Sequence, residues 1–336
     1  MGDKLKAGDE VKSRYFLDIR RFVRDNIESV IIYLVLVIIA VVGSIIAPDF
    51  TKPQNIKNVL LQAVALGLVA IGQTVVIISG GLDLSVGATI SMVAVYTSGL
   101  MAGRSGILIV LPIVILTILM ALSIGFLNSM IITKLRITPF IATLAMGSVT
   151  QGIVLMYTKI PRGLISPEWK FFAEGTIFGI HFGVMFFFAF LLVTLFMLKK
   201  TILGKYIYAV GGSETTARLS GIRTVRVLVF VYMFSSFMAS LSALFLISRM
   251  GIGDPQVGGL NYQLYDLESI AAVLVGGTSL SGGIGSVIGT LAGVLILTLL
   301  NNIFNLSGVS TFYQWVIKGA IIIGAVATYR LIREEK

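Results

Sequence analysis

The sequence predicts an all-α, polytopic transmembrane helical bundle of about ten spans with broken glycine-rich segments. Two observations predict this fold class: the long apolar stretches and the placement of the positive charges. Of the 336 residues, 56% are hydrophobic and 12% are charged, and the mean hydropathy is +0.97. A soluble domain carries roughly 25% charged residues, so we expect most of this surface to face lipid.

Ten apolar stretches are candidate spans, since one helical crossing needs about 20 consecutive apolar residues. They cover residues 27–47, 58–79, 84–102, 107–132, 138–158, 180–198, 227–248, 266–282, 284–304 and 312–330. A glycine-rich segment joins the eighth and ninth stretches without a charged loop between them. Because ten spans leave only short connections, we expect one transmembrane domain over residues 27–331.

The positive charges lie mostly on one side of these stretches. Lys and Arg gather in residues 1–26, 199–226 and 330–336, and this bias places both termini in the cytoplasm by the positive-inside rule. We expect residues 1–26 to form an amphipathic segment on the inner leaflet and residues 332–336 to form a cytoplasmic tail. The net charge of +10 follows from this topology, so membrane lipid is an expected partner and nucleic acid is not.

Motifs for catalysis and nucleotide binding do not occur in the sequence. Without a G-x-x-x-x-G-K-[ST] loop, the chain has no phosphate loop to hold ATP. Cysteine is absent and His181 is the only histidine, which leaves no set of thiolate and imidazole ligands for a metal ion. We therefore expect no catalytic residue, no metal site and no cofactor held by this chain.

Two similar glycine-rich segments follow apolar runs in the two halves of the chain. Residues 80–85 read Gly-Gly-Leu-Asp-Leu-Ser and residues 276–281 read Gly-Gly-Thr-Ser-Leu-Ser. Broken segments at corresponding places in two halves are typical of a transporter's path, and two tight turns at the inner surface are the alternative. The predicted path or gate residues are Gly80, Gly81, Asp83, Ser85, Gly276, Gly277, Ser279 and Ser281.

Asp83 is an acidic residue at the edge of a predicted span. A carboxylate within a span costs roughly 2.5–3.5 kcal/mol on insertion scales, so Asp83 reaches the interface, faces a polar cavity or caps the next helix. Capping, in which the carboxylate accepts backbone N–H bonds, is the simplest expectation. Few other acidic residues enter the spans, although proton-driven carriers normally use them. We therefore expect an energy source outside the chain.

The cytoplasmic loop 199–226 encodes a short helix outside the membrane. Ser213 suits the N-cap, Glu214 and Arg218 suit the two ends of the helix dipole, and Gly221 suits a left-handed stop. So short a helix is unstable in water by itself and forms against a partner. Docking is the favoured interpretation, and a solvated loop is the alternative.

Three ordered motifs resemble those of one transporter family. Residues 204–222 fit G-x-x-x-x-A-x-G-G-[SN]-E-x-x-A-R-L-S-G-I, residues 80–87 read GGLDLSVG, and residues 275–290 read VGGTSLSGGIGSVIGT. Over roughly residues 30–330, the chain resembles the permease subunits of ribose-type ABC transporters, which are binding-protein-dependent importers.

The resemblance implies a homodimeric permease in the cell inner membrane that forms the path for a monosaccharide such as ribose, xylose or galactose. Its partners would be cytoplasmic ABC ATPase subunits or a fused tandem ATPase, which bind ATP and Mg²⁺, and an extracytoplasmic solute-binding protein. Carried onto this chain, the resemblance assigns ATPase coupling to Gly204, Ala209, Gly211, Glu214, Ala217, Arg218, Leu219, Ser220 and Gly221.

The resemblance does not say which side chains contact the solute. A sugar path needs neutral hydrogen-bonding groups, and the candidates in the spans are Gln73, Asn128, Gln151, Asn301 and Asn302. A hydrogen bond between helices is the alternative for each of them. On the outer side, binding-protein docking is assigned to Arg104, Arg162, Lys170 and Arg249, with an ordinary membrane-interface belt as the alternative.

Other transporter classes fit part of the same sequence. A permease for a nucleoside or a branched-chain amino acid would share the architecture, and an exporter would need no binding protein. A secondary carrier or channel independent of ATP would account for the spans and the charge bias, but it leaves the capped inner helix without a role.

Overall fold

The computed structural model describes residues 27–259, 264–317, 319–320 and 323–324, which are mostly helical. The elements are α2 (Ile27–Ile46), α3 (Pro53–Ile78), α4 (Val86–Met101), α5 (Ile107–Lys134), α6 (Pro139–Tyr157), α7 (Pro167–Glu174), β1 (Thr176–Ile177), β2 (Ile180–His181), α8 (Phe182–Lys200), α9 (Ile202–Gly212), α10 (Glu214–Leu219), α11 (Thr224–Met250), α12 (Tyr265–Val275) and α13 (Val287–Leu306). The predicted segments 1–26 and 332–336 lie outside the described residues, as does much of stretch 312–330.

Six helices in the described part of the chain are long and apolar enough to cross a bilayer: α3, α5, α6, α8, α11 and α13. The apolar parts of α2 and α4 are shorter. The prediction of a mainly helical protein with several membrane-spanning helices is therefore confirmed. The count of about ten spans stays a prediction.

The eighth apolar stretch, residues 266–282, does not form a full-length helix. Its helix α12 has 11 residues, which is about 16 Å at 1.5 Å per residue and roughly half of a 30 Å hydrocarbon core. The helix ends at Val275 with Gly276 as its C-cap, and Gly277 takes a φ of 83°, a conformation that glycine adopts without strain. Apolar composition does not reveal where the backbone leaves the helix.

Helix α4 is also shorter than its apolar stretch, with 16 residues. It follows the non-helical residues 79–85, much as α12 follows the non-helical segment 251–259. The two regions meet at Gly87 and Gly258, where a Cβ on Gly258 would overlap the Gly87 carbonyl oxygen. The Gly258 amide donates a hydrogen bond to Ser91 Oγ at 3.1 Å. The start of α4 and the segment 251–259 therefore touch inside the bundle.

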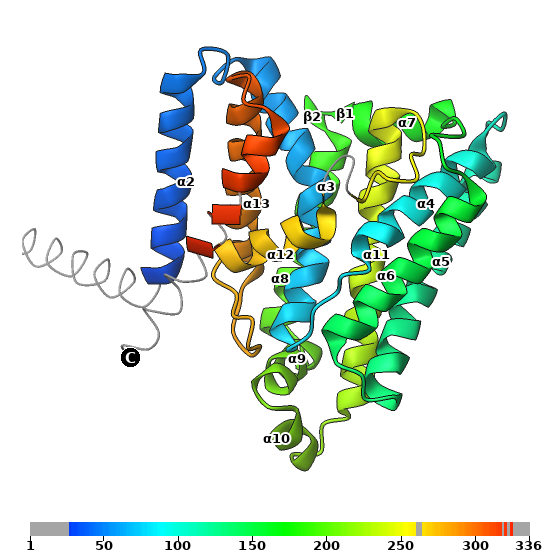
Figure 1. Cartoon of the computed structure of the whole chain (residues 1–336), viewed down its shortest axis with the longest axis vertical. Coiled ribbons are helices and arrows are strands. Elements are labelled where there is room, and N and C mark those ends of the chain that lie inside the picture. Colours follow the sequence, from blue (N-terminus) through cyan, green and yellow to red (C-terminus); the bar gives the residue numbers. More distant parts are fainter. Residues whose placement is uncertain (1–26, 260–263, 318, 321–322, 325–336) are drawn as a thin grey trace, which may run out of the picture.

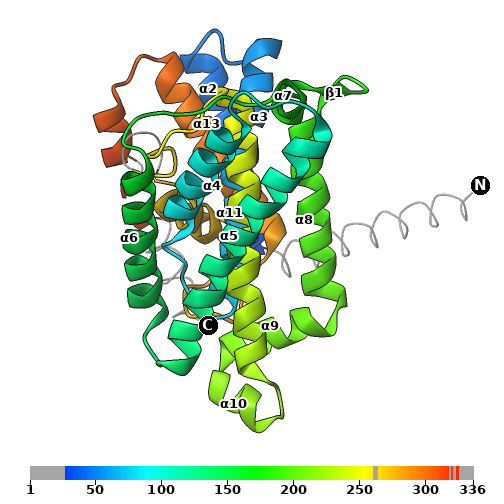
Figure 2. The same cartoon turned by 90° about the vertical axis from the view of Figure 1, so that its right-hand side faces the viewer.

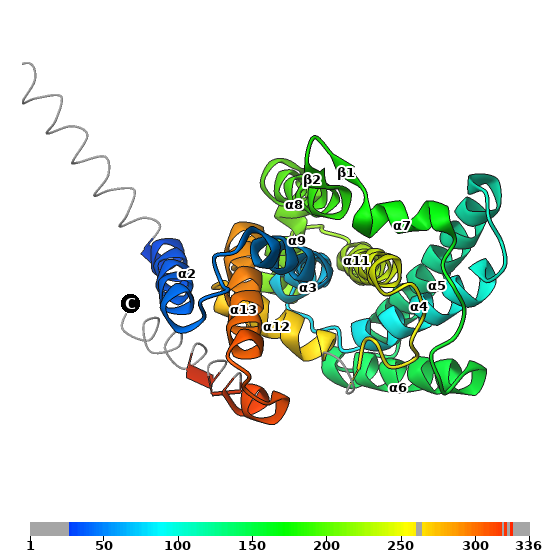
Figure 3. The same cartoon turned by 90° about the horizontal axis from the view of Figure 1, so that it is seen from above.

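Helices α3 and α11 form the centre of the bundle. Seen along the bundle in Figure 3, they lie between α8, α12, α13 and the α4–α5 pair. Tyr232 and Phe245 of α11 are fully buried, and α11 packs against α3, α4, α5 and α7. By contrast, only 28–33% of the apolar windows of α5, α6 and α8 is buried, which leaves most of their residues at least partly open to lipid.

Small residues bring α12 and α13 together. A Cβ on Gly289 would overlap the Gly276 carbonyl oxygen, and a Cβ on Gly293 would overlap the Ala272 carbonyl oxygen. Close helix approach through small residues is the usual packing mode in membranes. Gly289 and Gly293 of α13 pack in this way against the end of α12.

The two ends of the bundle carry different small elements (Figures 1 and 2). Helices α9 and α10 project at one end, which we call the α10 end. Helix α7 and the β1–β2 hairpin, in which Thr176 pairs with His181, lie at the opposite end, which we call the α7 end.

Candidate functional site

The short helix α10 has both ends set by its own sequence. Ser213 adopts an extended backbone, and its Oγ accepts a hydrogen bond from the Thr216 amide at 3.2 Å, which makes it an N-cap. Gly221 follows the helix with a φ of 84° and stops it in the left-handed region. The predicted capped helix within residues 213–221 is therefore confirmed.

The surface of α10 projects away from the membrane-spanning helices. Glu214 and Arg218 form an ion pair one turn apart, and Thr224 Oγ1 of α11 donates to Glu214 Oε1 at 3.0 Å. Leu219 is 85% exposed at the end of the helix. Because an exposed pair at this spacing contributes only about 0.3–0.5 kcal/mol, these side chains do little for folding and are available to a partner.

Helix α9 meets the rest of the bundle at Gly80, Gly211, Gly282 and Gly283, which we call the glycine junction. A Cβ on Gly211 would overlap the carbonyl oxygen of Ile78, and a Cβ on Gly282 would lie 2.9 Å from Gly80 Cα. The Gly283 amide donates to the Ile78 carbonyl at 2.8 Å. Backbone therefore touches backbone where α9, the end of α3 and the α12–α13 turn meet.

Tyr208 adds a side-chain link between α9 and the same turn. Its hydroxyl donates to the Gly285 carbonyl at 2.8 Å. Burial raises the pKa of Tyr208 above its usual value, so the hydroxyl keeps its proton and remains a donor at neutral pH. Of the predicted coupling residues, Gly204, Ala209 and Gly211 lie on α9, Glu214, Ala217, Arg218 and Leu219 lie on α10, and Ser220 and Gly221 follow it.

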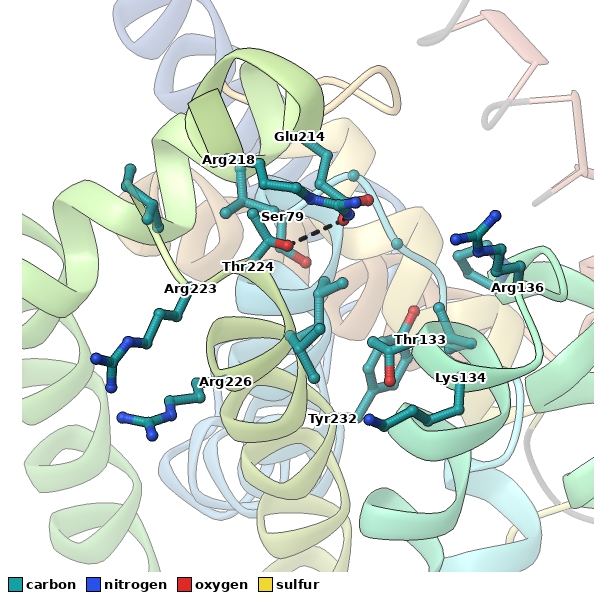
Figure 4. A pocket seen from close by; sticks show the side chains of 18 of the residues that line it. Ser79, Thr133, Lys134, Arg136, Glu214, Arg218, Arg223, Thr224, Arg226 and Tyr232 are labelled. Carbon is teal, nitrogen blue, oxygen red and sulfur yellow. Dashed lines mark hydrogen bonds and ion pairs between the residues drawn. The ribbon is translucent and has the colours of Figure 1, made fainter. Parts of the chain in front are cut away.

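A cavity of about 950 Å³ lies beside α10, between the end of α5 and the start of α11. Its walls are rich in cations, as Figure 4 shows: Lys134, Arg136, Arg218, Arg223 and Arg226. Glu214 is the carboxylate among the lining residues, and it is paired with Arg218. Gly80, Gly81 and Tyr232 also line the cavity. The predicted coupling helix and the first glycine-rich segment thus share one cavity.

Asp83 is fully buried in a hydrogen-bonded network. Its Oδ1 accepts from the Ser85 amide at 3.0 Å and from Ser85 Oγ at 2.6 Å, and its Oδ2 accepts from Ser235 Oγ at 2.8 Å. Asn128 Nδ2 donates to Ser85 Oγ at 2.8 Å. No side chain caps α4, so the capping prediction for Asp83 is wrong. The carboxylate instead ties α11 and, through Ser85, α5 to the broken segment before α4.

The remaining amide candidates lie in separate places. Gln73 is fully buried in α3, and its side-chain oxygen and nitrogen have no hydrogen-bond partner among the described residues. Gln151 donates to a backbone carbonyl of the segment before α12 at 2.9 Å. Asn302 and Asn55 exchange two hydrogen bonds of 2.8 Å, which is helix-to-helix pairing. Asn301 lines a second cavity, toward the α7 end.

The second glycine-rich segment forms the turn between α12 and α13. Gly276 packs against the Gly289 backbone, Gly277 has a positive φ, and Ser279 Oγ accepts from the Ser281 amide at 3.3 Å. This turn borders the glycine junction, so the two similar segments meet at the α10 end. Their role as a path or gate stays a prediction.

The four predicted docking cations lie toward the α7 end, and all four are exposed. Arg104 follows α4, Lys170 belongs to α7, and Arg249 lies in the last turn of α11. The guanidinium of Arg162 stands 5.5 Å from the centre of the Tyr157 ring. Their use as a docking surface stays a prediction.

Several contacts of the site have no signal in the local sequence. Ser235 and Tyr232 lie within an apolar stretch, and Ser235 is 152 positions from the Asp83 that it bonds. Tyr208 and Thr224 lie inside or next to the predicted loop, but only the fold brings them to Gly285 and Glu214.

The fold defines a class of protein: a helical membrane protein whose bundle carries a projecting capped helix at one end and non-helical segments inside. The family described as "Branched-chain amino acid transport system / permease component" matches residues 55–326, and the chain belongs to that family. The family resemblance of the sequence motifs is therefore confirmed. The family consists of permease components and not of enzymes.

Curated relatives are similar over most of their length. The chain is 41% identical to the ribose import permease protein RbsC of Bacillus subtilis, over 88% of this chain and 90% of the relative. It is 32% identical to the L-arabinose ABC transporter permease protein AraH of Azospirillum brasilense, over 88% and 85%. It is also 32% identical to the galactose/methyl galactoside import permease protein MglC of Haemophilus influenzae, over 90% and 94%. No solved structure matches the chain significantly.

Proposed function

We propose that this chain is the transmembrane permease subunit of an ATP-driven importer of a monosaccharide. The observation that carries the proposal is the exposed, capped helix α10, which continues into α9 and its backbone contacts at the glycine junction. Relatives named for ribose, arabinose and galactose support the class of substrate. The chain performs no bond chemistry, and ATP and Mg²⁺ bind to a separate ATPase.

In this mechanism α10 docks on a cytoplasmic ATPase subunit. ATP-driven closure of the ATPase displaces α10 and, with it, α9. Because Gly211 leaves no room between α9 and the Ile78 carbonyl, the displacement is passed to the end of α3 and to the α12–α13 turn. The two conformations of the ATPase bind α10 with different free energies. This difference couples the ATPase cycle to the movement of the permease.

The path for the solute passes the non-helical segments 79–85 and 251–259. Gln73 and Asn128 support this position of the path, because the Gln73 amide and Asn128 Oδ1 have no partner among the described residues. A polar group left unpaired inside a membrane protein costs free energy unless water or a solute bonds to it. Neutral amides and hydroxyls suit a neutral sugar, which brings hydroxyl groups and no charge.

The topology proposed is ten crossings, with the α10 end and both termini in the cytoplasm. Two copies form the permease in the cell inner membrane, since the resemblance implies a homodimer. The α7 end then faces the solute-binding protein, and Arg104, Arg162, Lys170 and Arg249 are available there to acidic residues of that protein.

Transport in proteoliposomes tests the function. The chain is reconstituted with its ATPase, and D-ribose uptake is measured with the binding protein outside and ATP inside. We expect uphill uptake only with all components present. Arg218→Gln should reduce uptake and ribose-stimulated ATP hydrolysis about tenfold, the effect of losing roughly 1.4 kcal/mol of coupling, while thermal stability stays unchanged.

The matched control is Lys52→Gln, which breaks an exposed ion pair with Asp49 at the α7 end. It should leave uptake unchanged. Normal transport by Arg218→Gln would overturn the coupling role of α10. Uphill uptake without the ATPase would favour a secondary carrier, and uptake of L-leucine in place of sugars would favour an amino acid permease.

A further inference from the structure

The second cavity of the bundle, of about 270 Å³, lies toward the α7 end between α3, α11, α12, α13 and residues 311–315. Its position follows from Gln62, in the first half of α3, and from Leu246, near the end of α11. Small-molecule sites in proteins have volumes of roughly 300–1,000 Å³. The cavity lies just below the lower end of this range, so only a small solute would fit.

The walls of this cavity are rich in neutral hydrogen-bonding groups. Four primary amides line it, from Gln62, Asn301, Asn305 and Gln314, together with the aromatic side chain of Trp315. Arg249 is the charged residue among the lining residues. A lipid phosphate or another anion would favour several cations, whereas this wall offers amides that both donate and accept hydrogen bonds.

The hydrogen bonds already made leave groups available in the cavity. Gln314 Nε2 donates to Asn305 Oδ1 at 3.0 Å and to the Val309 carbonyl at 2.8 Å, which leaves Gln314 Oε1 as an acceptor. Asn301 Oδ1 is buried and has no partner in the described part of the chain. A buried acceptor without a partner is unfavourable, and a hydrogen bond from a solute hydroxyl would remove that cost.

Asn302, the residue after Asn301, shows how an amide that joins two helices differs from one that faces the cavity. Asn302 exchanges two hydrogen bonds with Asn55, and both are buried. Asn301 lines the cavity from the same helix but lacks such a partner. The amides of the cavity are therefore not explained by helix pairing alone.

We propose that this cavity is a low-affinity subsite for a monosaccharide, which the solute occupies on entering from the α7 end. The inference rests on the proposed function. Sugar hydroxyls both donate and accept hydrogen bonds, so they match the amides of Gln62 and Asn301, while the Trp315 ring offers an apolar surface to the sugar's C–H groups. A site along a path binds weakly, because the solute must also leave it.

Equilibrium binding of radiolabelled D-ribose tests the subsite. The probe is added to the full permease–ATPase complex in lipid nanodiscs, without the binding protein. We expect saturable binding in the wild-type complex, weakened about tenfold by Gln62→Leu and by Asn301→Leu through the loss of one hydrogen bond each. L-leucine should not compete.

The matched control is Gln54→Leu, which makes the same change at an exposed position at the start of α3. It should bind ribose like the wild type. Asn301 Oδ1 makes no hydrogen bond within the described chain, so we expect Asn301→Leu to keep the thermal stability of the wild type. Measuring that stability checks that the variant folds.

Saturable binding that both cavity variants weaken supports the subsite. Binding unaffected by either variant, or no binding by a complex that imports ribose with its binding protein, overturns the subsite and leaves the proposed function standing. A complete system that imports no monosaccharide overturns the proposed function itself.

Discussion

Asn301 and Asn302 are neighbours in sequence with different surroundings. Asn302 faces α3 and pairs with Asn55, whereas Asn301 faces a cavity and its Oδ1 is unpaired within the described residues. One residue along a helix turns the side chain by about 100°. The same amide therefore serves packing at one position and remains available to a solute at the other.

Replacing Asn302 should cost stability. Asn302→Leu removes both hydrogen bonds to Asn55 and leaves the buried Asn55 Oδ1 without a partner, while Asn55 Nδ2 keeps its bond to the Phe50 carbonyl. We expect this loss to cost about 1–2 kcal/mol for a hydrogen bond in a membrane protein. Thermal unfolding of the complex in nanodiscs measures this loss. The double variant with Asn55→Leu should be more stable than the sum of the single changes predicts. Strictly additive losses would contradict the pairing.

Among the elements, α10 and α12 differ in what specifies them. The ends of α10 follow from Ser213 and Gly221, which act within a few residues. Helix α12 has Gly276 as its C-cap, and this position must be glycine because it packs against the Gly289 backbone of another element. Helix α9 combines both cases, since its start is capped by Thr201 and its end is fixed by contacts at Gly211.

Gly211→Ala should separate α9 from the bundle. Its Cβ would overlap the Ile78 carbonyl oxygen, so we expect a lower melting temperature and a loss of ribose-stimulated ATP hydrolysis. Gly212→Ala is the matched control, because its Cβ meets nothing within 4 Å and alanine favours a helix over glycine by about 1 kcal/mol. Equal effects of the two variants would mean that the glycine junction does not transmit motion.

For the whole molecule, the orientation in the membrane follows from the charges. The cavity beside α10 gathers cations from two regions distant in sequence, with Lys134 at the end of α5 and Arg218 and Arg226 in the loop 199–226. Positive charge is retained in the cytoplasm during insertion. The α10 end is therefore expected inside the cell and the β1–β2 hairpin outside.

Single-cysteine labelling measures this orientation directly, because the chain contains no cysteine. Phe178→Cys places a thiol in the β1–β2 turn, where the side chain is 97% exposed, and Leu219→Cys places one at the end of α10. A membrane-impermeant maleimide should label the first variant in spheroplasts and the second only after lysis. The cysteine-free parent is the control, and the reverse pattern would invert the topology.

Much of the fold could be predicted from local pattern. The apolar stretches locate the long helices because a span requires length and hydropathy, both of which are written in consecutive residues. The capped helix α10 could also be predicted, because Ser213 and Gly221, which set its two ends, lie within a few residues of it. The close contacts of α4 and α12 with other elements, such as Gly87 with Gly258, could not be predicted in this way, because they join residues far apart in the chain.

The candidate site, too, could be predicted from the sequence only in part. The amides Gln73, Asn128 and Asn301 stand out in the sequence as polar residues in apolar stretches, but the sequence does not say which of their polar atoms are paired. Asp83 shows the limit: its expected cap is replaced by bonds to Ser85 and to the distant Ser235. The amides of Gln62, Asn305 and Gln314 come to one cavity only through packing.

The sequence by itself determined that this protein lies in a membrane, where its short helix begins and ends, and which family it resembles. These properties depend on hydropathy, charge and capping, which act between residues close together in the chain. The tertiary structure alone decided which amides are paired and that the two glycine-rich segments meet α9. Those outcomes depend on backbone approaching backbone across the bundle, and no local pattern encodes that distance.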